Sequence, residues 1–182
     1  MNMERLLEAC KKNDRKAQEQ LYRLLASKML HLCLRYASST FDAEEMLQAG
    51  FIKVFSHIHQ FSGAGSFEGW VRRIMVNTAI EYCRKDFKME RIDQLSDQEY
   101  LNSGFVEINH LEARDLLDMV QELAPGYRII FNMYAIEGFS HREIAETLNI
   151  SESSSKSQLS RARVRLQEKI KQMEGAYHGI RK

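Results

Sequence analysis

The residues best suited to chemistry lie near the C-terminus, where basic and hydroxyl side chains recur at helical spacing. Ser157 and Arg161 project from one side of a predicted helix, and Lys156 and Arg163 lie on its flanks. Arginine can donate two hydrogen bonds to a guanine edge, whereas serine and lysine reach phosphates. A helix of this kind fits the major groove of DNA, with its N-terminal turns toward the bases. The pattern predicts DNA recognition, although a basic helix taken alone is as often an ordinary solvated face.

A helix, a tight turn and a second helix are predicted around these residues. Ser140 and Glu143 form an S-x-x-E capping box, which satisfies free N–H groups at a helix start. Asn149 tolerates the left-handed backbone that ends a helix, and Ser151 can cap the next one. The second helix carries an apolar stripe at spacings of three and four, formed by Leu159, Ala162, Leu166 and Ile170. Together these features favour a helix-turn-helix over an ordinary basic surface.

Length and composition allow a small helical protein of one or two domains. The 182 residues are 44% hydrophobic, so a core can form, and the single proline, Pro125, favours helices nearly throughout. No run of about eighteen apolar residues predicts a membrane span, and the first residues lack the apolar centre of a signal peptide. The three cysteines, Cys10, Cys33 and Cys83, form no C-x-x-C pair, so we interpret them as reduced cytosolic thiols in the core.

Charge is distributed unevenly along the chain, although the net charge is only +1. Residues 151–182 contain eight basic and three acidic residues, which suits a polyanionic partner. Residues 86–110 contain two basic and six acidic residues and show little helical periodicity. We interpret this stretch as an acidic, flexible linker between two helical domains.

The N-terminal half predicts three helices. Asp14 is expected to begin the first, and Asp42, with Glu45 three residues later, the second. After a turn with two glycines, a third helix is expected from Phe67 to about Lys85. The apolar positions expected in the core are Ala17, Leu21, Leu24, Leu25 and Leu32 of the first helix, Leu47, Phe51, Val54, Phe55 and Ile58 of the second, and Phe67, Val71, Ile74, Thr78 and Tyr82 of the third.

Two outward faces of these helices carry residue types suited to binding. On the second helix, Ile52 stands among polar residues, which indicates a partner surface, although single exposed apolar side chains are common. The third helix presents a row that suits phosphate and base contacts, although by spacing alone a plain helix surface is favoured. The members of this row are Arg73, Asn77, Ile80 and Arg84.

Four blocks of sequence, taken in order, resemble bacterial sigma factors. Residues 42–51, 67–77 and 84–85, followed by the helix-turn-helix, are similar to the extracytoplasmic-function (ECF) branch of the sigma-70 family. The resemblance covers nearly the whole chain outside the linker. It implies an all-α fold of two small helical domains. These are a sigma-2 helical bundle at residues 1–85 and a sigma-4 helix-turn-helix domain at residues 111–182, joined by the linker at residues 86–110.

The resemblance implies a factor that binds core RNA polymerase and that recognises and melts promoter DNA. The matching positions assign contacts with the polymerase β′ coiled coil to Glu44, Glu45, Gln48 and Ile52, contacts with the −10 element to Arg73, Asn77, Arg84 and Lys85, and contacts with the −35 element to Lys156, Ser157, Arg161 and Arg163. The sigma-4 domain would also dock on the polymerase β flap. A further implied partner is an anti-sigma factor. The resemblance implies no catalytic residue, metal or cofactor, and we expect a cytoplasmic protein without membrane insertion.

The chain departs from the family pattern at a few positions. Residues 153–155 are all serine where Gly-Thr-Val is frequent, so Ser155 puts a hydroxyl at the first position of the apolar stripe. We therefore expect this turn to pack less firmly. Further departures are Glu81, Gly126 and Gln158.

Two other classes of function compete with this interpretation. A transcription regulator without a polymerase role could carry a similar helix-turn-helix, but the blocks around Gln48 and Trp70 argue against it. An enzyme or metal protein could use His31, His57 and His59. Residues at i and i+2 of a helix do not face each other, however, and no carboxylate or cysteine cluster completes such a site.

Overall fold

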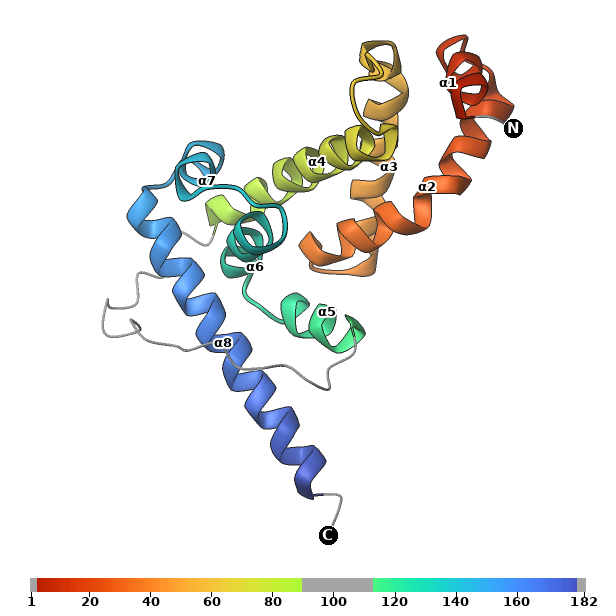
Figure 1. Cartoon of the computed structure of the whole chain (residues 1–182). Coiled ribbons are helices and arrows are strands. Elements are labelled where there is room, and N and C mark those ends of the chain that lie inside the picture. Colours follow the sequence, from red (N-terminus) through yellow and green to blue (C-terminus); the bar gives the residue numbers. More distant parts are fainter. Residues whose placement is uncertain (1–2, 90–112, 180–182) are drawn as a thin grey trace. The chain divides into compact units, whose positions relative to one another are not determined.

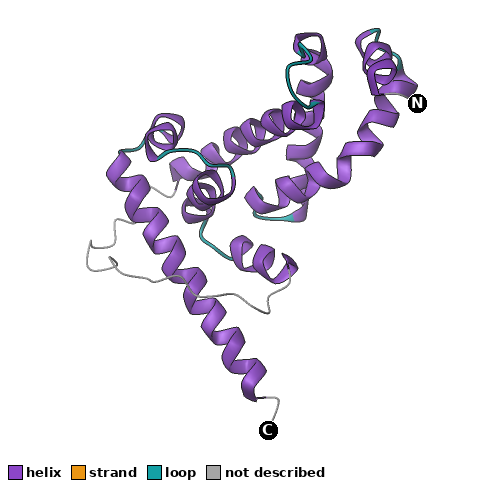
Figure 2. Ribbon diagram, viewed as in Figure 1, coloured by secondary structure: helices purple, strands orange, loops and turns teal. Residues whose placement is uncertain are grey.

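Helices form every regular element in the part of the chain that the structure, a computed structural model, describes, namely residues 3–89 and 113–179 (Figure 1, Figure 2). The all-α expectation is confirmed. The chain divides into two compact units, Met1–Cys83 and Arg84–Lys182, which we call unit 1 and unit 2. The acidic linker predicted at residues 86–110 lies almost entirely outside the described residues. None of the described helices combines the length and apolar character that a bilayer span requires.

Unit 1 is a bundle of long helices with a close crossing at its centre. Gly50 of α3 lies so close to α4 that an added Cβ would come within 2.2 Å of the Sδ atom of buried Met75. Only glycine fits there without displacing the neighbouring side chain. The elements are α1 (Met3–Lys11), α2 (Arg15–Tyr36), α3 (Thr40–His57), the 3-10 turn η1 (Ile58–Gln60) and α4 (Phe67–Met89). The boundary between the units falls within α4, so its residues from Arg84 onward are counted in unit 2.

Capping side chains determine where α2 and α3 begin. Asp14 caps α2 as expected, because its carboxylate accepts two backbone N–H groups at 2.8 and 3.1 Å. The start predicted for α3 at Asp42 is wrong. Ser39 is the cap, and its hydroxyl accepts the N–H of Asp42 at 3.1 Å. Asp42 stands inside the first turn, where its carboxylate accepts a 3.0 Å hydrogen bond from the Tyr82 hydroxyl of α4.

The buried surface of unit 1 differs most from the predicted stripes at Leu24 and Ile80, whereas Phe55, Ile74 and Tyr82 are half-buried. Leu24 is 53% exposed, because it lies just outside the edge of the face that α2 buries. Ile80, which we expected in the outward row of α4, is only 3% exposed. The buried face of α4 is wider than one stripe, since it also includes Met75, Val76, Ala79 and Cys83. In addition, α4 continues to Met89, beyond the end expected near Lys85.

The three cysteines belong to the packed interior of unit 1. Cys10, Cys33 and Cys83 are free thiols and are buried. Burial raises the pKa of the Cys33 thiol to about 12 and also raises the pKa of Cys10. A thiol that stays protonated is a poor nucleophile and a poor metal ligand. Their interpretation as buried thiols in the core is confirmed.

Unit 2 is arranged along its last helix. Figure 1 shows α8 running the length of the unit, with α7 against its N-terminal end and α6 and α5 farther along. Pro125 is the first residue of α6, a position where its missing N–H has no helical partner to lose. The elements are α5 (Ala113–Gln121), α6 (Pro125–Phe131), the π-helix η2 (Asn132–Ile136), α7 (His141–Leu148) and α8 (Glu152–Gly179). Side chains with at most 3% exposure at the centre of this core are Ile129, Ile130, Met133, Ile144, Leu159 and Ala162.

Candidate nucleic-acid interface

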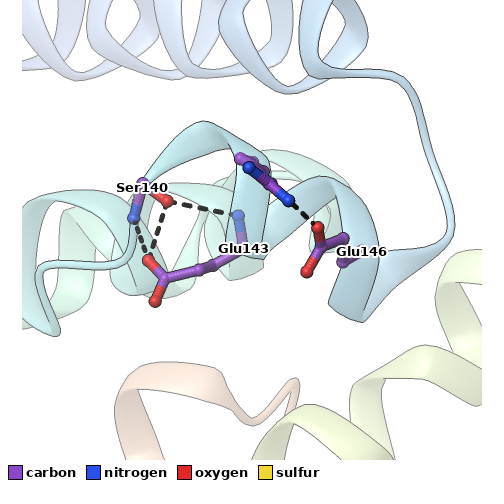
Figure 3. A network of polar contacts seen from close by, with 4 residues as sticks. Ser140, Glu143 and Glu146 are labelled. Carbon is purple, nitrogen blue, oxygen red and sulfur yellow. Dashed lines mark hydrogen bonds and ion pairs between the residues drawn. The ribbon is translucent and has the colours of Figure 1, made fainter.

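The start of α7 is held by the predicted capping box. The Ser140 hydroxyl accepts the N–H of Glu143 at 3.2 Å, and the Glu143 carboxylate accepts the N–H of Ser140 at 2.8 Å (Figure 3). The same carboxylate also accepts the Ser140 O–H at 2.7 Å. These hydrogen bonds lower the pKa of Glu143, because they stabilise the ionised form. The reciprocal pair therefore leaves few backbone N–H groups without an acceptor at the N-terminus of this short helix.

The turn between α7 and α8 also follows the prediction. Asn149 has left-handed backbone angles, φ 56° and ψ 52°, and ends α7. The hydroxyl of Ser151 accepts the N–H of Ser154 at 3.0 Å, which caps the start of α8. Because both devices are local, they set the direction of α8 relative to α7 without a long loop. The two helices and this turn form the helix-turn-helix predicted from the sequence.

The apolar stripe of α8 leaves its basic residues on the outer side. Leu159, Ala162 and Ile170 are buried, and Leu166 is half-buried. Of the four residues assigned to −35 recognition, Lys156 and Arg163 are exposed, whereas Ser157 and Arg161 are half-buried. Lys156 lies 3.9 Å from the Glu152 carboxylate, a weak surface pair. Ser157 donates its hydroxyl proton to the carbonyl of Ser154 at 3.1 Å.

A contact between α8 and η2 involves one of these basic residues. The guanidinium carbon of Arg163 lies 5.7 Å from the centre of the Tyr134 ring, within the range of a cation–π interaction. The Tyr134 ring stacks on His141, with 4.4 Å between ring centroids and 24° between planes. Periodicity could not reveal these contacts, because Tyr134 belongs to a π-helix in which the usual helical spacing is interrupted.

Ser155 stands at the first position of the apolar stripe of α8, as expected, and is completely buried. The looser packing expected from its hydroxyl stays a prediction. The Oγ atom of Ser155 lies 2.9 Å from Nδ1 of His141. A buried hydroxyl with a hydrogen-bond partner does not carry the cost of an unpaired polar group.

The outward row of α4 retains three of its four members. Arg73, Asn77 and Arg84 are exposed and share one face, since they stand four and seven residues apart. Ile80 is excluded from the row by its burial. Lys85 belongs to α4, but its side chain lies outside the described residues. The structure therefore leaves three polar side chains exposed on one face of α4.

The outward face of α3 carries all four residues that we assigned to polymerase binding. Glu44, Glu45 and Gln48 are exposed, and Ile52 is 67% exposed. Sequence reasoning missed a fifth member of this face. Phe41 is 68% exposed and precedes Ile52 by eleven residues, which is about three helical turns. The spacing of four, three and four residues along this face was the signal that could have identified it.

Two of the three histidines considered as metal ligands, His31 and His57, make local contacts. Nδ1 of His31 lies 2.7 Å from the carbonyl of Ser27, and Nδ1 of His57 lies 2.8 Å from the carbonyl of Lys53. Each ring therefore pairs with the backbone of its own helix, one turn earlier. Within residues 3–89 and 113–179 no group of three or more His, Cys, Asp or Glu side chains could hold a metal ion.

Sequence segments in both units match known protein families. Sigma-70 region 2 matches residues 21–87, and Sigma-70, region 4 matches residues 113–166. ECF RNA polymerase sigma factor SigE of Mycolicibacterium smegmatis is 28% identical over 155 residues, which are 82% of this chain and 60% of that relative. ECF RNA polymerase sigma factor SigM of Bacillus subtilis is 27% identical over 150 residues, covering 81% of this chain and 91% of the relative.

Among solved structures, the sigma factor RpoE of Bartonella quintana, in complex with the anti-sigma factor NepR, is 21% identical. Its comparison covers 84% of this chain and 96% of that chain, with a TM-score of 0.49. The two matched regions follow each other along the chain in the order expected from the sequence blocks. The curated relatives named above are ECF sigma factors. The chain belongs to the extracytoplasmic-function branch of the sigma-70 family of RNA polymerase sigma factors.

Proposed function

We propose that this chain directs promoter-specific transcription initiation with three helix faces that have separate tasks. The outward face of α3 binds the β′ coiled coil of core RNA polymerase. The outward row of α4 recognises and melts the −10 element, and the outer side of α8 reads the −35 element. We assign the first two tasks to a sigma-2 domain at residues 1–85 and the third to a sigma-4 domain at residues 111–182, which also docks on the polymerase β flap.

The single observation that best supports this proposal is the exposure of Ile52. The other large apolar side chains in the middle of α3, Leu47, Phe51 and Val54, are buried, yet Ile52 is 67% exposed among polar residues. A large apolar side chain surrounded by polar groups is a common arrangement for an interface anchor. Glu44 and Glu45 add two carboxylates about two helical turns earlier on α3, which suit basic groups on a partner helix.

The row on α4 supports the proposed role at the −10 element. Arg73 and Arg84 can neutralise phosphates, which positions a strand and makes binding salt-dependent. Asn77 lies between them and can donate and accept hydrogen bonds at a base edge. Melting requires that a base leaves the stack, which costs a few kcal/mol and needs a binding surface to offset that cost. A rigid helix with three outward polar side chains provides such a surface.

The outer side of α8 supports the proposed role at the −35 element. The buried stripe holds α8 against the rest of unit 2, so the opposite side remains available to a groove. Lys156 and Arg163 are exposed and suit phosphates. Half-buried Arg161 stands two residues from Arg163 and is the candidate for a bidentate contact with guanine.

We infer the remaining properties from the family. The protein acts in the cytoplasm by binding polymerase and promoter DNA, and it is not itself an enzyme. It uses no cofactor. An anti-sigma factor that covers the same faces is a further proposed partner.

Binding of purified core polymerase to the full chain tests the proposal. The double variant Gln48→Ala with Ile52→Asp should bind at least about thirtyfold more weakly, because loss of a central interface anchor commonly costs about 2 kcal/mol or more. Its circular dichroism should match the parent. Leu24→Asp is the matched control, since Leu24, like Ile52, is a large exposed aliphatic side chain but lies on α2. Equal affinities for the parent and the double variant would refute the assignment of α3.

Promoter melting needs a separate measurement. Asn77→Ala should assemble a holoenzyme with normal affinity but should form fewer open complexes at the −10 element. Permanganate reactivity of unpaired thymines measures this directly. The template is a promoter selected by in vitro transcription from a library of randomised promoters. Undiminished reactivity in the melted region would contradict the role of Asn77.

A further inference from the structure

One side chain of α7 contacts both neighbouring elements of the helix-turn-helix. His141 is the first residue of α7. Its Nδ1 atom lies 2.9 Å from Oγ of Ser155 in the first turn of α8, and its ring stacks on Tyr134 of η2 at 4.4 Å. The imidazole therefore joins the start of the DNA-facing helix to the two elements that support it.

Ser155 occupies a position where helical packing would ordinarily place an apolar side chain. It precedes buried Leu159 by four residues and buried Ala162 by seven, so it continues their stripe. The Ser155 side chain is 0% exposed, and a buried hydroxyl without a partner is costly. His141 supplies the side-chain partner. The position of the first turn of α8 thus depends on a directional hydrogen bond.

We propose that His141 is a positioning residue for −35 recognition, which acts by holding Ser155 and with it the first turn of α8. Lys156 follows Ser155 directly, and Ser157 follows next, so a shift of this turn moves side chains that we assign to DNA contact. The inference rests on the function proposed for α8. It concerns a contact that neither helical periodicity nor the family resemblance predicted.

The surroundings of His141 favour the neutral ring. Burial lowers the pKa of His141, and the charges of Lys156 and Arg163 on α8 lower it further. Glu152, also on α8, acts in the opposite sense and is the smallest of these effects. The other ionisable groups on α7 and η2 are Arg142 and Glu146, which pair at 3.1 Å, Glu143, which is held in the capping box, and the phenol of Tyr134.

The direction of the pH dependence follows from this lowered pKa. An exposed histidine titrates near 6.5, and the folded site binds its proton less readily. The arrangement is therefore fully stabilised above about pH 6.5 and loses this stabilisation as the pH falls toward the lower folded pKa. Protonation puts a third cation beside Lys156 and Arg163. Although Nδ1–H of the charged ring can still donate to the Ser155 hydroxyl, this repulsion weakens the placement of the ring between α8 and η2.

A double-mutant cycle tests the contact in the holoenzyme, formed from the full chain and core polymerase. The DNA probe is a duplex with the −35 sequence enriched from a randomised library. His141→Phe keeps an aromatic ring against Tyr134 but removes the nitrogen, and Ser155→Val removes the hydroxyl. Each single variant should bind about fivefold to tenfold more weakly, because each leaves one polar group facing an apolar one. The double variant should bind within about twofold of the parent, since both polar groups are gone.

A pH series adds a readout that simple loss of packing would not change. Between about pH 7.5 and pH 5.5, affinity should fall for the parent relative to the double variant, which carries no imidazole at this position. Thermal unfolding of the free chain over the same range should show the same relation. Additive losses in the double variant, or identical pH profiles for the two proteins, would overturn the inference.

Arg161→Ala separates this inference from the proposed function. If Arg161→Ala changes −35 preference while the losses from His141→Phe and Ser155→Val are additive, α8 reads DNA and only the positioning role fails. If Arg161→Ala leaves both preference and affinity unchanged, the proposed role of α8 fails. In that case the unfolding measurements still decide whether His141 and Ser155 are coupled.

Discussion

Unit 1 and unit 2 hold their functional helices with different kinds of contact. In unit 1, α3 and α4 meet through an apolar crossing so close that Gly50 touches buried Met75, and polar contacts such as Tyr82 with Asp42 lie toward its edge. In unit 2, short α7 is held by a capping box, a left-handed turn and the contact of His141 with α8. The comparison indicates that the binding faces of unit 1 depend on volume in the core. Those of unit 2 depend on a few polar groups in defined places.

The largest expected effect comes from adding volume where unit 1 is tightest. Gly50→Val should lower the free energy of unfolding by about 2–3 kcal/mol, because the added Cβ and its two methyl groups must displace the buried Met75 side chain. Urea unfolding followed by circular dichroism measures it. Gln48→Ala, two residues earlier on the exposed side of α3, should unfold like the parent. Parent-like stability of Gly50→Val would mean that the crossing can expand, and the contrast between the units would weaken.

Neighbouring arginines of α8 sharpen the comparison on the side of unit 2. Arg161→Ala should relax preference at one or two −35 positions, equivalent to roughly 1–3 kcal/mol of discrimination. Arg163→Ala should lower affinity evenly across sequences, because phosphate contacts carry no sequence information. Arg165→Ala is the matched control, since Arg165 is exposed and pairs with Glu168 at 3.2 Å. Selection from a randomised −35 library at fixed salt tests all three. An unchanged sequence logo for Arg161→Ala would exclude base reading by that residue.

The turn of the helix-turn-helix should respond to backbone preference alone. Asn149→Ala should destabilise unit 2 by about 1–2 kcal/mol, because the left-handed conformation at φ 56° crowds an alanine Cβ. Asn149→Gly should be neutral or slightly stabilising, since glycine adopts this conformation freely. Thermal unfolding of both variants provides the comparison. Equal stabilities would show that the turn tolerates another backbone geometry.

The smallest expected effect concerns the cap of α7. Ser140→Ala should cost about 1 kcal/mol in unfolding free energy, the usual value for loss of an N-cap hydroxyl. Since the pKa of Glu143 is lowered in the folded chain, its stabilisation is present above the unfolded value of 4.5 and is lost as the pH falls through the folded pKa. Stability of the parent should therefore decrease on acidification in this range more than that of Ser140→Ala. If the unfolding free energies of the parent and Ser140→Ala change in parallel with pH, the capping box does not stabilise the folded chain.

Local chemistry explains which parts of the fold could be predicted. The caps at Asp14 and Ser140 and the left-handed Asn149 were predicted because each acts on backbone within four residues. The start of α3 was predicted at Asp42, whereas the structure places the cap at Ser39. Both residues carry capping side chains, and only the backbone shows which one is used. The exposed positions on α3 followed from periodicity, because the helix is long and its core lies on one side.

The sequence by itself determined the all-α class, the helix-turn-helix and the order of the two matched regions, because capping, turn geometry and apolar period act over a few residues. Only the tertiary structure decided that Leu24 faces solvent, that Ile80 is buried and that Ser155 is paired with His141. These outcomes depend on which surfaces meet after the helices have formed. A periodic pattern describes one helix at a time, whereas burial and hydrogen bonding across α7 and α8 are properties of two helices together.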